Sequence, residues 1–412
     1  MGDVKELVSD ETRFYKHVET LTMSQKLFID LLKDWHENQR NMLILVSGGP
    51  GSGKTYTVIE TLKFINYKAI KMAPTALIAN KINGRTIHST MKLNWRRGST
   101  LNKIETLLEE ENDVEKCLKT SKPLGDEMCC NESEQIIVMD EIGMVPFWFT
   151  YWIIRYFFNA KHGTLFIAMG DSRQLKPVKS QFNIFNVDFD KEFEIYRIQL
   201  QESKRFEPDY IPIIEELSKL VDEKNHVKLF EYVSAIYPVV ESIDVNILKQ
   251  CKRALVYKNS TVELYNKFYM SQLPGIAYRL YKIDNGKIDK TNYTDLKPGC
   301  EVVVTENFAS VDNEGRYPIM NGSILIFNEY DNKTDRVICY DNYNQKVSIG
   351  RSMFTNVIPI VPNFAGTIHK FQGQTIDINN IVFNFNGCTD LHLIYTALSR
   401  VRSLSQILAV AL

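Results

Sequence analysis

Residues 48–55 read Gly-Gly-Pro-Gly-Ser-Gly-Lys-Thr and directly follow the apolar run Met-Leu-Ile-Leu-Val at residues 42–46. An apolar strand, a glycine-rich turn and a helix-forming stretch at residues 56–64 are the context that a phosphate-binding loop requires. Glycines let backbone N–H groups converge on phosphates, and the positive end of a helix dipole supports the same anion. A chance glycine-rich turn would not explain the complete pattern. The sequence therefore predicts a site for a nucleoside triphosphate.

The residues of this loop have distinct expected roles. Lys54 would reach the β- and γ-phosphates, and the Thr55 hydroxyl would hold Mg²⁺. The other loop residues would surround the phosphates: Gly49, Pro50, Gly51, Ser52 and Gly53.

Length and composition indicate a globular chain of about two to four domains, because 412 residues exceed one ordinary core. Apolar residues make up 44% and charged residues 24%, and no apolar run approaches the ~18–20 residues of a membrane span. Seven cysteines without a C-x-x-C pair fit a reducing compartment. The polar N-terminus shows no secretory signal. An intracellular location is expected, either the cytoplasm of a bacterial host or the nucleus or cytoplasm of a eukaryotic or virus-infected cell.

The order of predicted elements indicates an α/β fold with two parallel-sheet domains. Strands and helices alternate from residue 43 to about 178, interrupted by an amphipathic helix and a loose cysteine-containing segment, and alternate again from about 196. A stretch rich in β-formers and turn residues is typical of a small barrel. The predicted domains are residues 1–89 with 135–195, an inserted subdomain and candidate strand-separating element at 90–134, residues 196–275 with 363–412, and a β insertion at 276–362.

Two carboxylates, Asp140 and Glu141, follow the apolar strand predicted at residues 135–140. Ligands of an open α/β sheet bind at the carboxyl ends of its strands. Asp140 would hold Mg²⁺ through its water shell, and Glu141 would orient and deprotonate the attacking water. An Asp-Glu pair alone could equally cap a helix. Its place after a strand that follows the phosphate-binding loop favours hydrolysis of the nucleotide.

A third strand end carries Gly-Asp-Ser-Arg-Gln-Leu-Lys-Pro-Val at residues 170–178. The Gln174 amide, beside the γ-phosphate, would distinguish a triphosphate from a diphosphate and transmit that difference to the adjacent domain. An ordinary Gly-Asp turn would explain the first two residues but not the whole stretch.

Further segments resemble the superfamily 1 helicases, specifically their RecD/Pif/Dda-like 5′-to-3′ group, superfamily 1B. They are Leu-Thr-Met-Ser-Gln at 21–25, Ala-Pro-Thr at 73–75, Thr-Ile-His-Ser at 86–89, Leu-Gln-Glu-Ser-Lys-Arg at 200–205, Gly-Thr-Ile-His-Lys-Phe-Gln-Gly-Gln-Thr at 366–375 and Tyr-Thr-Ala-Leu-Ser-Arg at 395–400. The resemblance extends over almost the whole chain. It implies two RecA-like domains in tandem, with a small insertion in the first and an SH3-like β-barrel insertion in the second.

The resemblance also implies roles for single residues. Gln25 would read the adenine base, and Gln372 with Gly373 would couple the nucleotide to DNA contacts in the second domain. Arg205 and Arg400 would reach the γ-phosphate from that second domain. The candidate DNA contacts offer donors to phosphates or rings to bases: Pro74, Thr75, His88, Trp95, Thr367 and His369.

The activity implied is ATP-dependent, Mg²⁺-requiring translocation 5′ to 3′ on single-stranded DNA, with duplex unwinding in replication, recombination or repair. A net charge of −1 does not itself indicate DNA, although a channel for one strand needs fewer cations than a duplex surface. The expected partners are single-stranded DNA, forked or tailed duplex DNA, and single-strand-binding or replisome proteins. No membrane partner is expected. The protein is expected to be a monomer. The alternatives are an RNA helicase, a translocase that remodels protein–DNA complexes, or a non-catalytic replisome scaffold that binds nucleotide.

Overall fold

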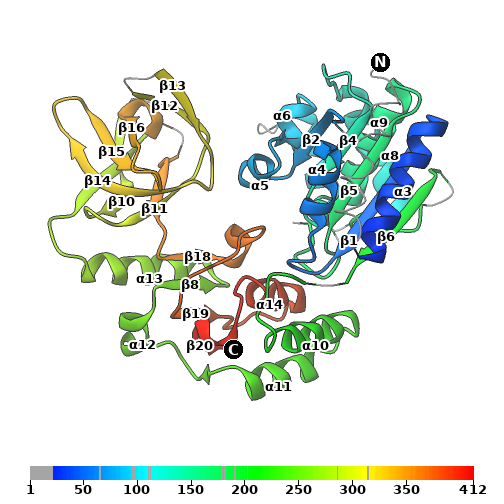
Figure 1. The fold of residues 1–412 in the computed structure, drawn as a ribbon. Coiled ribbons are helices and arrows are strands. Elements are labelled where there is room, and N and C mark those ends of the chain that lie inside the picture. The colour runs from blue at the N-terminus through cyan, green and yellow to red at the C-terminus, as the bar shows by residue number, and fades with distance from the viewer. Residues whose placement is uncertain are drawn as a thin grey trace. The chain divides into compact units, whose positions relative to one another are not determined.

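The chain is described by a computed structural model in which it forms two compact units, Met1–Phe206 and Glu207–Leu412. Figure 1 labels their helices and strands. The described residues are 22–64, 66–94, 98–109, 111, 113–177, 180, 182–189, 192–201, 203–284, 286–312, 315–355 and 357–412. In that part of the chain no helix is both long and apolar enough to cross a membrane.

Unit 1 is built on a six-stranded parallel sheet with the order β3-β2-β4-β5-β1-β6. The strands are β1 (Met42–Gly48), β2 (Ala69–Ala73), β3 (Arg85–Thr86), β4 (Ile136–Met139), β5 (Leu165–Gly170) and β6 (Ile195–Leu200). Strands β1, β4 and β5 are continuous, almost wholly buried apolar runs, as expected where a parallel sheet is covered on both faces. Strand β5 lies between β1 and β4, so the carboxyl ends of all three strands are neighbours.

Alternating side chains of β1 assign the helices of unit 1 to the two faces of this sheet. Met42, Ile44 and Val46 pack in a cluster with α3 and α4, whereas Leu43 and Leu45 pack in a cluster with α7, α8 and α9. The helices are α3 (Met23–Asn38), α4 (Lys54–Phe64), α5 (Ala76–Lys81), α6 (Ile87–Thr90), α7 (Thr100–Leu108), α8 (Val114–Glu127), the 3-10 helix η1 (Ile142–Met144) and α9 (Phe147–Ala160).

Strand β6 corrects one predicted domain boundary. The second domain was expected to begin at residue 196, but β6 pairs with β1 from Leu43↔Ile195 to Gly48↔Leu200 and so completes the first sheet. The apolar pattern of residues 196–200 predicts a strand correctly but does not reveal which strand it pairs with. The prediction that the second domain starts there is therefore wrong.

The segment at residues 90–134 contains two helices rather than one. Helix α7 is the predicted amphipathic helix, and α8 occupies the stretch expected to be loose, although it contains Pro123 and Gly125. Leu101 of α7 and Leu124 of α8 are buried in the same cluster as the aromatic side chains of α9. This segment therefore shares the core of unit 1. Trp148 and Phe149 of α9 are buried there too.

Unit 2 contains a second parallel sheet with the order β18-β8-β19-β20-β7. Its strands are β7 (Val239–Val240), β8 (Arg253–Val256), β18 (Ala365–Thr367), β19 (Ile381–Asn384) and β20 (Ile407–Ala411). Its helices are α10 (Ile211–Asp222), α11 (His226–Ile236), α12 (Val245–Gln250), α13 (Asn259–Gln272), α14 (Leu391–Leu398) and the 3-10 helices η3 (Ile368–Phe371) and η4 (Leu404–Gln406).

The β-rich stretch between α13 and β18 is antiparallel throughout and has its own apolar cluster. It comprises the hairpin β9 (Tyr278–Asp284) and β10 (Lys287–Leu296), the hairpin β12 (Phe308–Asp312) and β13 (Gly315–Ile319), the 3-10 helix η2 (Arg351–Phe354), and a sheet of β16 (Lys346–Gly350), β15 (Arg336–Tyr340), β14 (Ile324–Asp331), β11 (Glu301–Val304) and β17 (Ile360–Pro362). A small barrel was expected in this stretch. Its SH3-like identity stays a prediction.

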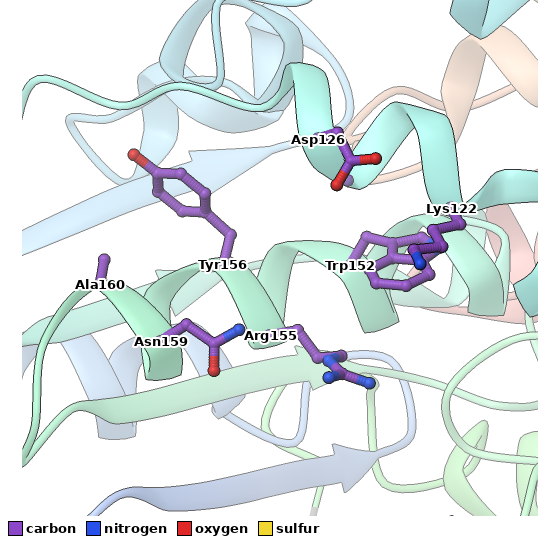
Figure 2. Close-up of a pocket in the computed structure, with 8 residues that line it drawn as sticks. Lys122, Asp126, Trp152, Arg155, Tyr156, Asn159 and Ala160 are labelled. Atoms are coloured by element: carbon purple, nitrogen blue, oxygen red, sulfur yellow. The ribbon is translucent and has the colours of Figure 1, made fainter.

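A surface pocket of about 620 Å³ lies between α8 and α9. Figure 2 shows its lining, which comes from α8 through Lys122, Gly125 and Asp126 and from α9 through Trp152, Arg155, Tyr156, Asn159 and Ala160. The Arg155 guanidinium lies 5.5 Å from the ring centroid of Trp152, a cation–π distance. The pocket includes none of the residues predicted to bind nucleotide or DNA.

Gly125 provides a test of this helix pair. A Cβ added at Gly125 would lie 2.7 Å from Cε3 of Trp152, in the rigid part of the indole. Alanine normally stabilises a helix interior by ~0.5–1 kcal/mol relative to glycine. Because overpacking costs ~1–3 kcal/mol, Gly125→Ala should instead lower the free energy of unfolding by about 1 kcal/mol in a urea titration. Lys122→Ala, at an exposed position of the same helix, should change it little; a more stable Gly125→Ala protein would contradict the close packing.

Candidate active site

The phosphate-binding loop predicted from the sequence connects β1 to α4. Gly51 and Gly53 have φ values of +76° and +81°, in the left-handed region that favours glycine. A Cβ at Gly51 would also lie 2.3 Å from Cβ of Arg205, so no other residue fits without displacing that segment. Two of the glycines in the motif are therefore required by the conformation of the loop itself.

Polar groups gather where this loop enters α4. The Lys54 Nζ donates hydrogen bonds to the carbonyl oxygens of Gly48 (2.7 Å) and Gly49 (3.1 Å), which holds the ammonium over the loop. The Ser52 Oγ is buried and has no hydrogen-bond partner among the described residues. A buried hydroxyl without a partner is costly, and it can donate to a phosphate oxygen. The loop therefore fits a polyphosphate.

Thr55 and Asp140, the two predicted Mg²⁺ ligands, lie in direct contact. The Thr55 Oγ1 donates to Asp140 Oδ2 at 2.9 Å, and the Glu141 N–H donates to Asp140 Oδ1 at 2.8 Å. Burial first, and the charge of Glu141 second, raise the pKa of Asp140 to about 6. A hydroxyl and a buried carboxylate in contact are oxygen ligands of the kind Mg²⁺ takes, and a bound cation would favour the ionised carboxylate.

Glu141, the predicted general base, has a left-handed backbone with φ +51° and ψ +39°. That conformation is uncommon for a residue other than glycine, and such residues occur often at functional sites. It turns the chain from β4 into η1 directly after Asp140. Glu141 is half-buried, so its carboxylate retains access to solvent.

Gln174 lies in the turn that follows β5 and is 4% exposed. Its Nε2 donates to Asp171 Oδ2 at 3.1 Å, while its Oε1 is buried without a hydrogen-bond partner among the described residues. The sequence predicts Asp171 only as part of a turn and does not predict the burial of its carboxylate. A signal for it was its place directly after an apolar strand, the same position that singled out Asp140.

Arg205 lies beside the phosphate-binding loop within unit 1. The Ser203 Oγ donates to the Pro50 carbonyl at 2.8 Å, and the Lys204 N–H donates to the Gly51 carbonyl at 2.9 Å. These bonds attach the segment after β6 to the loop. The expectation that Arg205 approaches from a second domain is therefore wrong, because β6 is a strand of the first sheet.

Gln25, the predicted adenine-reading residue, belongs to the capping box of α3. Its Oε1 accepts a bond from the Thr22 N–H at 3.0 Å, and its Nε2 donates to Thr57 Oγ1 at 2.9 Å. These partners fix which atom of the amide is the acceptor and which is the donor. Thr57, on α4, was not identified from the sequence.

The candidate DNA contacts of unit 1 follow β2 and β3. Thr75 is exposed and caps α5 by accepting from the Ile78 N–H, and Pro74 precedes it. His88 lies on α6 with its ring 5.5 Å from that of Phe149, and burial lowers its pKa to about 4. His88 is therefore a neutral imidazole at physiological pH. Trp95 lies outside the described residues.

The Thr-Ile-His sequence occurs once in each unit with a similar backbone turn, although the Thr86 side chain caps the α-helix α6 whereas Thr367 precedes the 3-10 helix η3 without a side-chain cap. Thr86 and Thr367 end strands with φ, ψ of −66°, 149° and −69°, 149°. The isoleucine that follows is buried in each case, and the histidine lies on a short helix. His369 is exposed. The repeated motif is thus a repeated structural unit at the end of a parallel strand.

The remaining candidates of unit 2 lie after this turn. Gln372 is buried, and its Oε1 has no hydrogen-bond partner in the described part of the chain; Gly373 has φ +73°. Arg400 is 1% exposed and donates to the carbonyl oxygens of Thr396 (2.9 Å) and Gln374 (3.3 Å). Arg400 therefore ties α14 to the segment that contains Gln372. Its role as an arginine finger stays a prediction.

Asp140 makes the stability of the protein depend on pH. Its pKa of about 6 in the folded state exceeds the ordinary 3.8, so the folded state binds more protons between pH 4 and 6 and loses stability as the pH rises through that window. Asp140→Asn removes this loss: its Oδ1 can accept from the Glu141 N–H as the carboxylate does, and its Nδ2 can donate to the Thr55 hydroxyl, which in the parent donates to Asp140. Without divalent cations, it should be more stable than the unsubstituted protein by about 3 kcal/mol at pH 8, with a smaller gain at pH 4.

Thermal unfolding at the two pH values measures this difference. Asp244→Asn is the matched control, because the exposed Asp244 caps α12 and asparagine caps equally well, so neither pH should reveal a change. An Asp140→Asn protein less stable than its parent at pH 8 would show that the carboxylate is not desolvated.

Comparison with known proteins relates this fold and site to one group. The model of the AAA domain family matches residues 35–180, the part of unit 1 that carries the phosphate-binding loop. The ATP-dependent DNA helicase Pif1 of Psychrobacter sp. (strain PRwf-1) is 22% identical over 93% of this chain and 67% of its own length.

Two solved structures share the fold. The Pif1 helicase from Candida albicans is 19% identical with a TM-score of 0.62, covering 95% of this chain and 94% of its own. The Pif1 helicase from Bacteroides in complex with ADP-AlF3 and ssDNA is 18% identical with a TM-score of 0.60, covering 94% and 92%. The chain therefore resembles the Pif1 helicases in sequence and shares their fold, with two parallel-sheet α/β units in tandem.

Proposed function

We propose that this protein is an ATP-dependent DNA helicase that translocates on single-stranded DNA and unwinds duplexes. The observation that carries the proposal is the gathering of a phosphate-binding loop, a Thr55–Asp140 pair, Glu141 and Gln174 at the ends of three neighbouring strands. The similarity to the Pif1 helicases, one of them in complex with ADP-AlF3 and ssDNA, supports ATP and DNA as its ligands.

The side chains suit hydrolysis. Lys54 would leave the loop carbonyls to bind the β- and γ-phosphates, and Glu141 would orient the attacking water and take its proton. Arg205, attached to the loop through Ser203 and Lys204, would stabilise charge on the transferred phosphoryl group. Thr55 and Asp140 would hold Mg²⁺, which neutralises charge on the phosphates when bound.

Translocation requires DNA affinity that changes during ATP turnover. The Thr-Ile-His turns give each unit a histidine at a strand end, joined by Thr75 in unit 1, and such groups contact phosphates without reading sequence. Arg400 and Gln372 lie in the segments of unit 2 that would respond to the γ-phosphate. Loss of that phosphate would change the preferred arrangement of the units and thereby the affinity of each for the strand.

The direction of movement, the oligomeric state, the form of the DNA and the cellular setting are part of the same proposal. We propose 5′-to-3′ movement by a monomer, on forked or tailed DNA, inside the cell and alongside single-strand-binding or replisome proteins, in replication, recombination or repair. The alternative of a non-catalytic scaffold is disfavoured by a site that combines Lys54, Glu141 and Arg205. The remaining alternative is an RNA helicase, and strand displacement on DNA and RNA duplexes distinguishes it.

Two substitutions separate nucleotide binding from hydrolysis. Lys54→Ala should remove ATP hydrolysis and weaken nucleotide binding, because it removes the cation that binds the phosphates. Glu141→Gln should keep binding and lower kcat by ~100-fold or more, because it removes the general base. Steady-state ATPase assays and fluorescent-nucleotide titrations measure both effects. Lys63→Ala, an exposed lysine of the same helix, should match the unsubstituted protein; equal loss of binding and hydrolysis in Glu141→Gln would instead indicate a structural role.

The proposed motor predicts stimulation by DNA. The ATPase rate should rise at least about tenfold on adding a single-stranded oligodeoxynucleotide, because strand binding would favour the hydrolysis-competent arrangement. Strand displacement should proceed on DNA duplexes with a 5′ tail and not with a 3′ tail. The same duplexes made of RNA are the control. Unwinding of RNA alone would transfer the proposal to an RNA helicase, and an ATPase rate indifferent to oligonucleotide would contradict the motor.

A further inference from the structure

Asp171 is a buried carboxylate that the proposed mechanism does not yet use. It directly follows β5 and is 3% exposed. Because β5 lies between β1 and β4, Asp171 lies at the edge of the sheet where the carboxyl ends of both neighbouring strands also lie. Burial raises the pKa of Asp171, opposed mainly by the positive charge of Lys54. A carboxylate here carries a desolvation cost that an amide or hydroxyl would avoid, so its chemistry requires an explanation.

Both oxygens of Asp171 are committed within the turn. Oδ1 accepts a bond from the Arg173 N–H at 3.0 Å, and Oδ2 accepts one from the Gln174 Nε2 at 3.1 Å. An ionised carboxylate can only accept. Gln174 must therefore direct its nitrogen, and not its oxygen, toward Asp171.

With the Gln174 nitrogen directed toward Asp171, the other atom of the amide is the acceptor Oε1. Gln174 Oε1 is buried without a hydrogen-bond partner among the described residues, in a side chain that is 4% exposed. A buried acceptor without a partner costs ~1–3 kcal/mol, so the site favours a ligand that donates. Oxygens of a terminal phosphate are acceptors, and they do not satisfy this atom. A water molecule does.

We propose that Asp171 is a positioning residue that sets the polarity of the Gln174 amide, so that Oε1 accepts a hydrogen bond from the water that attacks the γ-phosphate. In that step the water oxygen forms a bond to the γ-phosphorus, and its proton passes to Glu141. The bond from the γ-phosphorus to the bridging oxygen breaks, and that oxygen leaves with ADP. The inference rests on the proposed function, because it assumes ATP hydrolysis at this site.

A double-mutant cycle tests the coupling. Asparagine at position 171 that keeps accepting from the Arg173 N–H through Oδ1 presents its Nδ2 donor to Gln174, so the amide polarity that Asp171 sets is no longer favoured. Asp171→Asn should lower kcat about 10- to 100-fold, as expected when the reacting group is misoriented, with the dissociation constant for a fluorescent ADP analogue unchanged. Gln174→Ala should lower kcat to a similar extent. The double variant should be no slower than Gln174→Ala, because Asp171 acts through the amide.

Independent losses would overturn the inference. If Asp171→Asn slows the Gln174→Ala protein by the same factor as it slows the parent, Asp171 acts without the amide. If Asp171→Asn does not fold, Asp171→Ser replaces it in the same cycle under the same criterion, because a hydroxyl can donate as well as accept and so does not fix the polarity of the Gln174 amide. Asp244→Asn is the control for loss of a carboxylate that binds backbone N–H only. An unsubstituted protein without ATPase activity would instead refute the proposed function, so the two failures are distinguishable.

Discussion

The hydrogen-bonded pairing of β1 with β5 on one side and β6 on the other is the constraint on which the whole site depends. The pairing places Ser47 beside Gly170 and Gly48 beside Leu200, so the phosphate-binding loop emerges between two chain segments. One of them contains Asp171 and Gln174, and the other contains Arg205. A register shift of one residue would turn the apolar side chains of β1 to the wrong faces of the sheet. Burial of those side chains therefore fixes the position of the polar ones.

The buried polar groups of the site cost free energy, whereas the packing of the apolar strands gains it. In unit 1, Ser52 and Gln174 each keep a buried polar atom without a hydrogen-bond partner among the described residues, and Asp140 keeps a carboxylate whose pKa is raised by burial. Each such group costs on the order of 1–3 kcal/mol when nothing binds it. Continuous buried strands on both sides of the loop offset these costs. The buried strands of unit 1 thus support the polar groups that lack hydrogen-bond partners. The same polar groups gain most from a ligand that donates to their acceptors and accepts from their donors.

Much of the fold follows from local sequence signals. Continuous apolar runs predict β1, β4 and β5 within a residue or two, and the glycine pattern predicts the loop whose left-handed φ values at Gly51 and Gly53 require it. The pairing partner of a strand does not follow from its own sequence. Nothing in residues 196–200 indicates that they pair with β1, and Arg205 was therefore assigned to the wrong unit. Helix α8 was missed because Pro123 and Gly125 normally end helices, whereas here Gly125 allows close contact with Trp152. Asp171 was missed because burial is a property of the folded chain.

One feature of unit 1 bears on how the protein would hold a polynucleotide. His88, on its short helix beside Phe149, is uncharged at physiological pH because burial lowers its pKa to about 4. A neutral imidazole that donates to a phosphate displaces no condensed counterion from the strand. In the DNA contact proposed for His88, its share of the binding free energy would therefore persist as ionic strength rises, while the share from lysine and arginine declines.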